Sequence, residues 1–327
     1  MAKKIDLSGQ TAIVTGGGRG VGRAHALMLA ERGASVVVND IGVEIDGSGG
    51  NGSLADEVVA EITKAGGKAV ASSDDVGTPQ GGADLVALAI KTFGKVDMLV
   101  HNAGIVQGAP FADAKIEDVQ RVIGIHLMGA WHVGQPAWRD MASRGYGRIV
   151  FTGSGAMFGH PMVGPYAAAK HGLIGLAKAL HQEAAMSQLD IKVNVVCPIA
   201  ATRMARDAQK ERFGPLMEPA GVSAVVTLLL SPQAPVSGEV FHAGCSHVAR
   251  IFVGQTVGWA LRKPGVTPEQ IRDHLDEAGQ LEGFEIPANA NEMSDLIYRI
   301  VIGDEKSLGD EILPTEYREK AKTEAGR

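Results

Sequence analysis

Short apolar runs alternate with longer amphipathic segments over most of this sequence. The run 11–15 is apolar on both faces, and 34–40 is rich in β-branched residues. Such runs are typical of strands buried inside a parallel sheet, and their alternation with helices predicts an α/β fold with helices on both faces. The other candidate strands are 68–72, 97–101, 148–152, 192–196 and 239–243, and the candidate helices are 23–32, 53–65, 80–93, 115–141, 166–187 and 221–230.

The end of the chain follows another pattern. Residues 261–327 hold 9 basic and 15 acidic side chains, whereas residues 1–260 hold 22 of each and 37 of the 43 glycines. We therefore expect a main domain over 1–260 and an acidic helical C-terminal extension over 261–327, with the boundary near 263–265. In the extension we expect helices at 268–280 and 291–302, followed by a loosely ordered segment.

Composition excludes several classes of protein. The net charge is −6, which gives no basic surface for nucleic acid, and no apolar run approaches the 18 residues of a membrane span. The N-terminus lacks the apolar core of a signal peptide. Two cysteines, Cys197 and Cys245, are too few for a disulfide framework and favour a reducing compartment, so we expect a cytoplasmic protein. The ten histidines show no metal-ligand spacing, so we expect no metal site.

Five glycines fall between positions 16 and 22, directly after the first strand and at the start of a helix. Glycines let the backbone turn sharply and approach a pyrophosphate, while the helix N-terminus offers unpaired N–H groups. A tight turn alone is the simpler explanation, but strand, glycine loop, helix and second strand occur here in order. The candidate dinucleotide-binding residues of this loop are Gly16, Gly18, Arg19, Gly20, Val21 and Gly22.

Asp40 ends the second strand and bears on the choice of cofactor. A carboxylate there can accept hydrogen bonds from both adenosine ribose hydroxyls and would repel a 2′-phosphate, which favours NAD over NADP. Arg19 acts in the opposite direction, because a cation in the loop could meet a 2′-phosphate. We expect Asp40 to decide the choice, and NAD to be the cofactor.

Tyr166 and Lys170 are four residues apart in a candidate helix, which places them on one face. A free tyrosine ionises near pH 10, but a lysine ammonium, helped by a cationic nicotinamide, would lower that pKa. Tyr166 is then a candidate general base for an alcohol proton. Ser154 follows the strand 148–152 and could hydrogen-bond the substrate oxygen.

These elements resemble the short-chain dehydrogenase/reductase family over about 1–245. That resemblance implies a Rossmann-type, doubly wound parallel sheet of about seven strands, and a homodimer or homotetramer. It also implies an oxidoreductase that interconverts a secondary alcohol and a ketone, in which Lys170 and Tyr166 also meet the cofactor. The remaining cofactor-binding positions implied by the family pattern are Asp75, Val76, Asn102, Ala103, Gly104, Pro198 and Thr202.

The stretches 36–42, 66–71, 126–129 and 201–204 are similar to a narrower branch of the family, which oxidises 3-hydroxyacyl-CoA thioesters. This similarity implies 3-hydroxyacyl-CoA as substrate and 3-ketoacyl-CoA as product. A hydroxysteroid or another secondary alcohol is the alternative substrate. A non-enzymatic NAD-sensing module is the alternative of another class, although such modules usually lose the tyrosine or the lysine.

Some positions depart from the wider family pattern. His126 stands where most members have asparagine, so it is either part of a catalytic proton relay or a buried structural histidine. Ser154 is one residue closer to Tyr166 than usual, and Gly153 holds the usual position. Ile199 replaces a glycine after Pro198, and His101 replaces an asparagine and is given no role. We expect the substrate pocket to be formed mostly by 107–114, 155–165 and 203–220.

Overall fold

The computed structural model describes residues 4–50, 53–203, 205, 207–261 and 265–302. Two compact units divide the chain, Met1–Ile251 and Phe252–Arg327. Most of the predicted boundary region 263–265 and the whole segment 303–327, predicted to be loosely ordered, lie outside the described residues.

One sheet of eight strands forms the first unit, in the order β3-β2-β1-β4-β5-β6-β7-β8. The first seven strands are parallel and β8 is antiparallel to β7, which confirms the α/β fold and its parallel sheet. The strands are β1 (Thr11–Thr15), β2 (Ser35–Asn39), β3 (Lys68–Ser72), β4 (Met98–His101), β5 (Tyr146–Thr152), β6 (Asp190–Ile199), β7 (Val240–Gly244) and β8 (His247–Ile251).

Strand β8 was not predicted, and the reason lies in its turn and its exposure. Cys245 and Ser246 join β7 to β8 with φ values of 52° and 57°. Two-residue hairpin turns with positive φ usually carry Asn or Gly, so these residues give no turn signal in the sequence. The strand itself is not buried on either face, so its sequence forms no apolar run.

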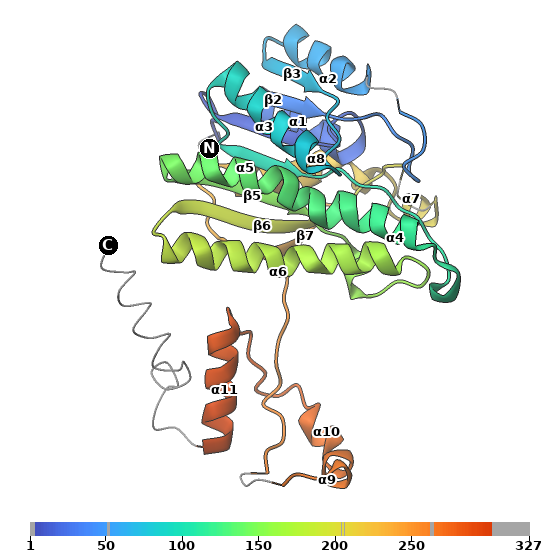
Figure 1. The fold of residues 1–327 in the computed structure, drawn as a ribbon, viewed down its shortest axis with the longest axis vertical. Helices are drawn as coiled ribbons and strands as arrows, with labels where there is room; N and C mark the ends of the chain where they lie inside the picture. Colours follow the sequence, from blue (N-terminus) through green and yellow to red (C-terminus); the bar gives the residue numbers. More distant parts are fainter. Residues whose placement is uncertain (1–3, 51–52, 204, 206, 262–264, 303–327) are drawn as a thin grey trace. The chain divides into compact units, whose positions relative to one another are not determined.

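Helices cover both faces of the sheet (Figure 1). The predicted helix 115–141 is in fact α4, a π-helical turn at Gly124–Met128 and α5, and α7 was not predicted. The helices of this unit are α1 (Gly20–Glu31), α2 (Ser53–Lys64), α3 (Pro79–Phe93), α4 (Ile116–Ile123), α5 (Gly129–Arg144), α6 (Gly164–Met186), α7 (Asp207–Phe213) and α8 (Pro219–Leu230).

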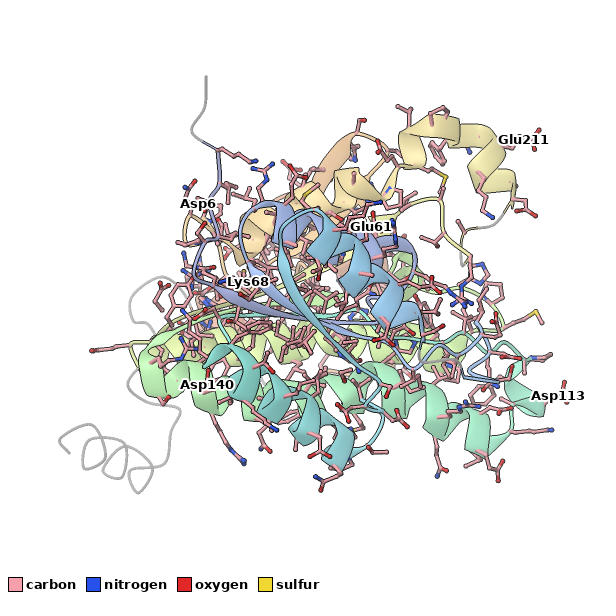
Figure 2. The ribbon with its side chains drawn as sticks, turned by 90° about the horizontal axis from the view of Figure 1, so that it is seen from above. Asp6, Glu61, Lys68, Asp113, Asp140 and Glu211 are labelled. Atoms are coloured by element: carbon pink, nitrogen blue, oxygen red, sulfur yellow. The ribbon has the colours of Figure 1, made fainter. Side chains whose placement is uncertain are left out.

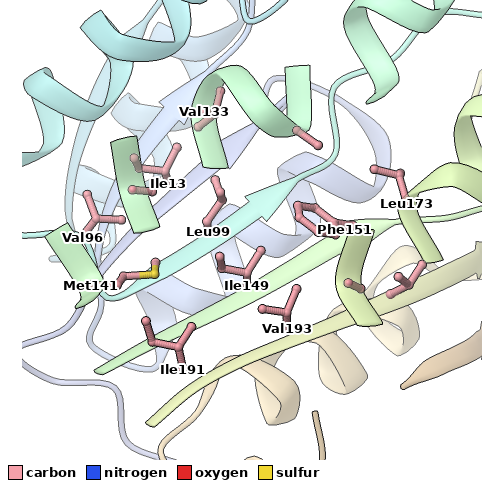
Figure 3. Close-up of a cluster of buried hydrophobic side chains, with 14 of the residues drawn as sticks. Ile13, Val96, Leu99, Val133, Met141, Ile149, Phe151, Leu173, Ile191 and Val193 are labelled. Carbon is pink, nitrogen blue, oxygen red and sulfur yellow. The ribbon is translucent and has the colours of Figure 1, made fainter. Parts of the chain in front are cut away.

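Strand side chains alternate between two apolar cores, as the period of two in a strand requires. Ile13 belongs to the core under α3, α5 and α6, whereas its neighbours Ala12 and Val14 belong to the core under α1, α2 and α8. Figure 3 shows the first core, with Val133 and Leu173 from the helices facing Ile13, Leu99 and Ile149 of the sheet. Exposed charged side chains such as Asp113 and Glu211 lie at the periphery (Figure 2).

The strand order reverses between β1 and β4. β1 continues into α1 on one face of the sheet, while the chain after β4 leads to α4 and α5 on the other. In doubly wound sheets, ligands bind in the crevice at the carboxyl ends of the strands at this switch point. The fold therefore directs attention to the residues that follow Thr15 and His101.

The described part of the second unit contains short helices joined by loops. Thr267 begins α9 with a capping box, in which its side chain and that of Gln270 each accept a backbone N–H. The predicted helix 268–280 is interrupted at His274, whose ring stacks on Trp259 with centroids 4.2 Å apart. The helices of this unit are α9 (Pro268–Asp273), α10 (Leu275–Ala278) and α11 (Ala290–Ile302).

Candidate active site

The turn between β1 and α1 is built so that only glycine fits at its key positions. Gly16 has φ +61°, and a Cβ on it would lie 2.8 Å from the Cα of Ala103. A Cβ on Gly22 would lie 2.0 Å from the carbonyl oxygen of Gly16. Helix α1 starts at Gly20, and Arg19 before it makes no side-chain cap. The first N–H groups of α1 are therefore available to an anion.

Asp40 lies at the end of β2 and faces this turn. Its carboxylate accepts hydrogen bonds from the backbone N–H groups of Gly18 (2.9 Å) and Gly42 (2.8 Å), one on each oxygen. A carboxylate has about four acceptor positions, so both oxygens can still accept from other donors. Gly18 holds Asp40 in place and is the one predicted cofactor residue that does not line the cavity described below.

Asn102 ties the end of β4 to the glycine turn. Its side-chain amide donates to the carbonyl oxygens of Thr15 and Gly16, both at 3.1 Å. The hydroxyl of Thr15 accepts from the backbone N–H groups of Asn102 (2.9 Å) and Ala103 (3.0 Å). Asn102 therefore fixes the shape of the turn.

Three further predicted residues complete this side of the site. Asp75 accepts a hydrogen bond from the N–H of Gly77 at 2.8 Å, and the neighbouring Val76 is buried. Thr202, after β6, lies so close to Gly20 that a Cβ there would be 3.2 Å from its methyl group. The ends of β1, β2, β4 and β6 and the loop after β3 thus converge, as the sequence predicts.

Ser154, Tyr166 and Lys170 meet on the other side of the crevice. Ser154 follows β5 and caps a short 3₁₀ turn, and its hydroxyl is close enough to the phenol of Tyr166 to lower the pKa of that phenol. The Lys170 ammonium lies 5.5 Å from the centre of the Tyr166 ring and donates to the carbonyl oxygen of Thr152. The three side chains that the sequence singles out are therefore neighbours in space.

Burial dominates the ionisation of these groups. It raises the pKa of Tyr166 above its usual value of 10.0, and the hydrogen bond with Ser154 only partly offsets this. Burial also lowers the pKa of Lys170 to about 7. The sequence led us to expect that the lysine lowers the pKa of Tyr166. In this structure burial outweighs that effect, because Lys170 is itself desolvated and directed at Thr152.

The position of the serine follows from packing around Gly153. A Cβ at position 153 would lie 2.6 Å from the sulfur of Cys197 and 2.8 Å from a methyl group of Val195. A serine there would point into β6 instead of the crevice. Ser154 is the residue whose hydroxyl reaches Tyr166.

His126 lies in the π-helical turn and is buried. Its Nε2 lies 2.7 Å from the carbonyl oxygen of Ile105 and 3.1 Å from the N–H of the same residue, and its ring meets that of Tyr166 edge-on at 5.0 Å. Burial lowers the pKa of His126 well below 6.5, which favours the neutral ring. Nδ1 is buried and has no partner within the described chain, which leaves it able to exchange a hydrogen bond with a bound group.

His101 has a structural place that its sequence position did not reveal. Its Nε2 lies 3.1 Å from the carbonyl oxygen of His126, and its Nδ1 lies 3.4 Å from the hydroxyl of Thr15. Because Thr15 already accepts two backbone N–H groups, its proton is directed to His101. His101 thus connects the end of β1 to the π-helical turn.

A cavity of about 620 Å³ joins the two sides of the site. Every predicted site residue except Gly18 lines it, and the predicted segments 155–165 and 203–220 also contribute. The predicted segment 107–114 does not. Ile105 and Val106 line the cavity in its place, because the loop after β4 turns away beyond them. The described residues contain no cluster of three or more possible metal ligands.

Comparison with known proteins agrees with this geometry. A family model for short chain dehydrogenases matches residues 10–212. The chain belongs to the short-chain dehydrogenase family. It is therefore an oxidoreductase of CH–OH groups in a family that uses a nicotinamide dinucleotide. The glycine turn, the uncapped start of α1 and the carboxylate of Asp40 fit such a cofactor.

Individual relatives confirm the narrower resemblance as well. Peroxisomal multifunctional enzyme type 2 of Mus musculus is 35% identical over 92% of this chain, which spans 41% of that enzyme's length. A hydroxyacyl-CoA dehydrogenase of Mycobacterium tuberculosis is 37% identical over 72% of this chain and 77% of its own. The crystal structure of a short chain dehydrogenase from Mycobacterium avium, 38% identical, superposes with a TM-score of 0.72, covering 83% of this chain and 95% of that one.

No single helix among the described residues is long and apolar enough to span a membrane. The segments Lys210–Met217 and Pro219–Leu230 together have the length and composition of such a span, with a bend of 55° between them. The second of these segments is α8, whose Val222, Val226 and Leu230 are buried in the core against the sheet.

Proposed function

We propose that this chain oxidises 3-hydroxyacyl-CoA thioesters to 3-ketoacyl-CoA with NAD as cofactor. The observation that carries the proposal is the meeting of Ser154, Tyr166 and Lys170 in one cavity with the glycine turn and Asp40. The thioester substrate is supported by the names of the relatives, among them a hydroxyacyl-CoA dehydrogenase.

The cofactor would be held by residues from several elements. Backbone N–H groups at the start of α1 would meet the pyrophosphate, and Asp40 would accept from the ribose hydroxyls of the adenosine. Asp75 and Val76 would meet the adenine, and Asn102 keeps the turn in shape. The other proposed contacts are Gly16, Gly20, Val21, Gly22, Ala103, Gly104, Tyr166, Lys170, Pro198 and Thr202.

The protein's own residues divide the proton chemistry between them. The hydroxyl of Ser154 holds the substrate oxygen beside the phenol, and the oxygen of Tyr166 receives the alcohol proton. Lys170 stabilises the phenolate that accepts this proton, and its position is set by the carbonyl oxygen of Thr152. Bound NAD supplies a hydride acceptor and a positive charge. That charge is needed, because burial alone raises the pKa of Tyr166.

His126 also has a role in the proposed proton transfer. Its unpartnered Nδ1 can exchange a hydrogen bond with a bound group, while its Nε2 is held by the backbone of Ile105. A neutral histidine of this kind can pass a proton onward without becoming charged at rest. We propose that it belongs to the relay between the buried Tyr166 and solvent.

The test is formation of NADH, followed by absorbance, with a panel of 3-hydroxyacyl-CoA thioesters and hydroxysteroids. The proposal predicts turnover of the thioesters with NAD and at most weak turnover with NADP. Faster turnover of hydroxysteroids would replace the substrate assignment by the alternative one. Dinucleotide binding without turnover of any alcohol would favour an NAD-sensing module and contradict the enzymatic proposal.

We further propose that the chain forms a homodimer or homotetramer and works in the cytoplasm. Both cysteines, Cys197 and Cys245, are unpaired thiols, which is compatible with a reducing compartment. Light scattering on the purified chain tests the first proposal, since a monomeric mass would contradict it. Imaging of the tagged chain in its own cells tests the second, and enclosure in an organelle would contradict it.

A further inference from the structure

The glycine-rich segment 42–50 brings a carboxylate between two arginines at the rim of the cavity. One oxygen of Glu44 lies 3.6 Å from a guanidinium nitrogen of Arg19, and the other lies 3.0 Å from one of Arg203. Arg203 also approaches the carbonyl oxygen of Val43 at 3.4 Å. Both arginines line the cavity, whereas Glu44 does not line it and pairs with them at its rim.

The backbone of this segment is fastened independently of these ion pairs. The N–H of Val106 donates to the carbonyl oxygen of Ile45 at 2.8 Å, and Arg121 of α4 donates to that of Gly47. Within the segment, Glu44 exchanges backbone hydrogen bonds with Gly47 and Ser48 at 2.9 Å. The carboxylate of Glu44 is therefore presented by an anchored loop.

Arg19 bears on cofactor choice because it follows Gly18, the residue that is hydrogen-bonded to Asp40. Gly18 donates its N–H to the carboxylate of Asp40 at 2.9 Å, and Arg19 follows Gly18 directly. The long side chain of Arg19 thus starts beside the place where Asp40 would receive the adenosine ribose. A phosphate on that ribose would need a nearby cation to offset the repulsion from Asp40, and Arg19 is suited to provide it.

We propose that Glu44 determines cofactor specificity by holding Arg19 in an ion pair, which withdraws this cation from a 2′-phosphate and disfavours NADP. The inference rests on the proposed use of NAD and adds a second carboxylate to Asp40. Specificity that combines an attractive group for one ligand with repulsion of its competitor is a general strategy. Glu44 does not line the cavity, so we expect its effect to be confined to the phosphorylated cofactor.

The test compares dinucleotide binding in Glu44→Gln and wild type, measured by the fluorescence of NADPH and NADH at low ionic strength. We expect Glu44→Gln to lower the Kd for NADPH about fivefold, or about 1 kcal/mol, and to change the Kd for NADH less than twofold. Glu61→Gln is the matched control, because Glu61 of α2 pairs with Arg23 of α1 and neither residue lines the cavity. It should leave both affinities unchanged.

A double-mutant cycle assigns the effect to one arginine. In the Glu44→Gln background, Arg19→Ala should abolish the tightening of NADPH binding relative to NADH binding, whereas Arg203→Ala should preserve it. An unchanged ratio of the two Kd values in Glu44→Gln, or a tightening that survives Arg19→Ala, overturns the inference. Equal unfolding midpoints of the variants, measured by circular dichroism, exclude misfolding as the cause.

Failure of the proposed function gives a different result. If the wild type binds NADPH as tightly as NADH, or binds neither, the assignment of NAD fails and the role of Glu44 fails with it. If the wild type prefers NADH and Glu44→Gln keeps that preference, only the inference about Glu44 is wrong. The two outcomes are distinguished by the wild-type titration alone.

Discussion

Replacing Gly22 by alanine sets two opposing effects against each other in the first turn of α1. Alanine is favoured over glycine in a helix by about 1 kcal/mol. Its Cβ, however, would lie 2.0 Å from the carbonyl oxygen of Gly16 and 2.5 Å from the side-chain nitrogen of Asn102. Both contacts are far inside normal separations, and the first partner is backbone that cannot rotate away.

The clash should exceed the gain in helix propensity. Overpacking of this kind costs about 1–3 kcal/mol, and displacing Asn102 weakens its hydrogen bond to Gly16, worth about 1 kcal/mol. We expect Gly22→Ala to lower the free energy of unfolding by about 1–3 kcal/mol. Because the displaced turn carries the proposed pyrophosphate contacts, the Kd for NADH should rise at least about tenfold.

Gly175→Ala is the matched control. Gly175 is exposed inside α6, and a Cβ there would have no neighbour within 4 Å. This variant should gain about 0.5–1 kcal/mol and bind NADH as the wild type does. Urea denaturation and fluorescence titration measure the two quantities. If Gly22→Ala were as stable as Gly175→Ala and bound NADH normally, the argument from close approach would be refuted.

Two further predictions concern the other side of the cavity. Ser154→Ala should lower kcat/KM about 10²–10³-fold. Adding Gly153→Ser should not restore kcat/KM, because a side chain at position 153 points at Cys197. Recovery of activity in steady-state assays of the double variant would show that position 153, not 154, is the place of the catalytic serine. Lys170 has a pKa of about 7 in the fold, against 10.5 ordinarily. Between these values the unfolded chain binds a proton that the folded chain does not. The stability of the wild type relative to Lys170→Met should therefore rise by about 1 kcal/mol per pH unit from about pH 7 to about pH 10 and stay level below pH 7. A flat difference in chemical denaturation across that range would contradict the buried, desolvated lysine.

Most of the fold could be predicted from the sequence, because the buried strands are continuous apolar runs. At their central positions, 12–14 and 36–38, the strands β1 and β2 face one core or the other, and all six residues there are apolar. Strand β8 and the π-helical turn at 124–128 gave no such signal. The first depends on a positive-φ turn without glycine or asparagine, and the second on an extra residue within a helical pattern.

The site could be predicted where residue type and spacing alone indicate the chemistry, as for Tyr166 and Lys170. It was not predictable where it depends on packing between distant segments. The choice of Ser154 over Gly153 follows from the contact with Cys197, 44 residues beyond Gly153. The ion pairs of Glu44 join a loop after β2 to one after β6, and the role of His101 appears only through its contact with the backbone of His126.

The proposed mechanism requires that the phenolate of Tyr166 takes the alcohol proton in a cavity that binds NAD. Its most direct test is steady-state turnover of a 3-hydroxyacyl-CoA by Tyr166→Phe, together with the Kd for NADH. Tyr146→Phe serves as control, because the Tyr146 hydroxyl accepts from Gln10 at the far end of β5 and lies outside the cavity lining. We expect Tyr166→Phe to lose at least about 10²–10⁴-fold in kcat with NADH binding retained, while Tyr146→Phe keeps its activity. Wild-type turnover by Tyr166→Phe would contradict it.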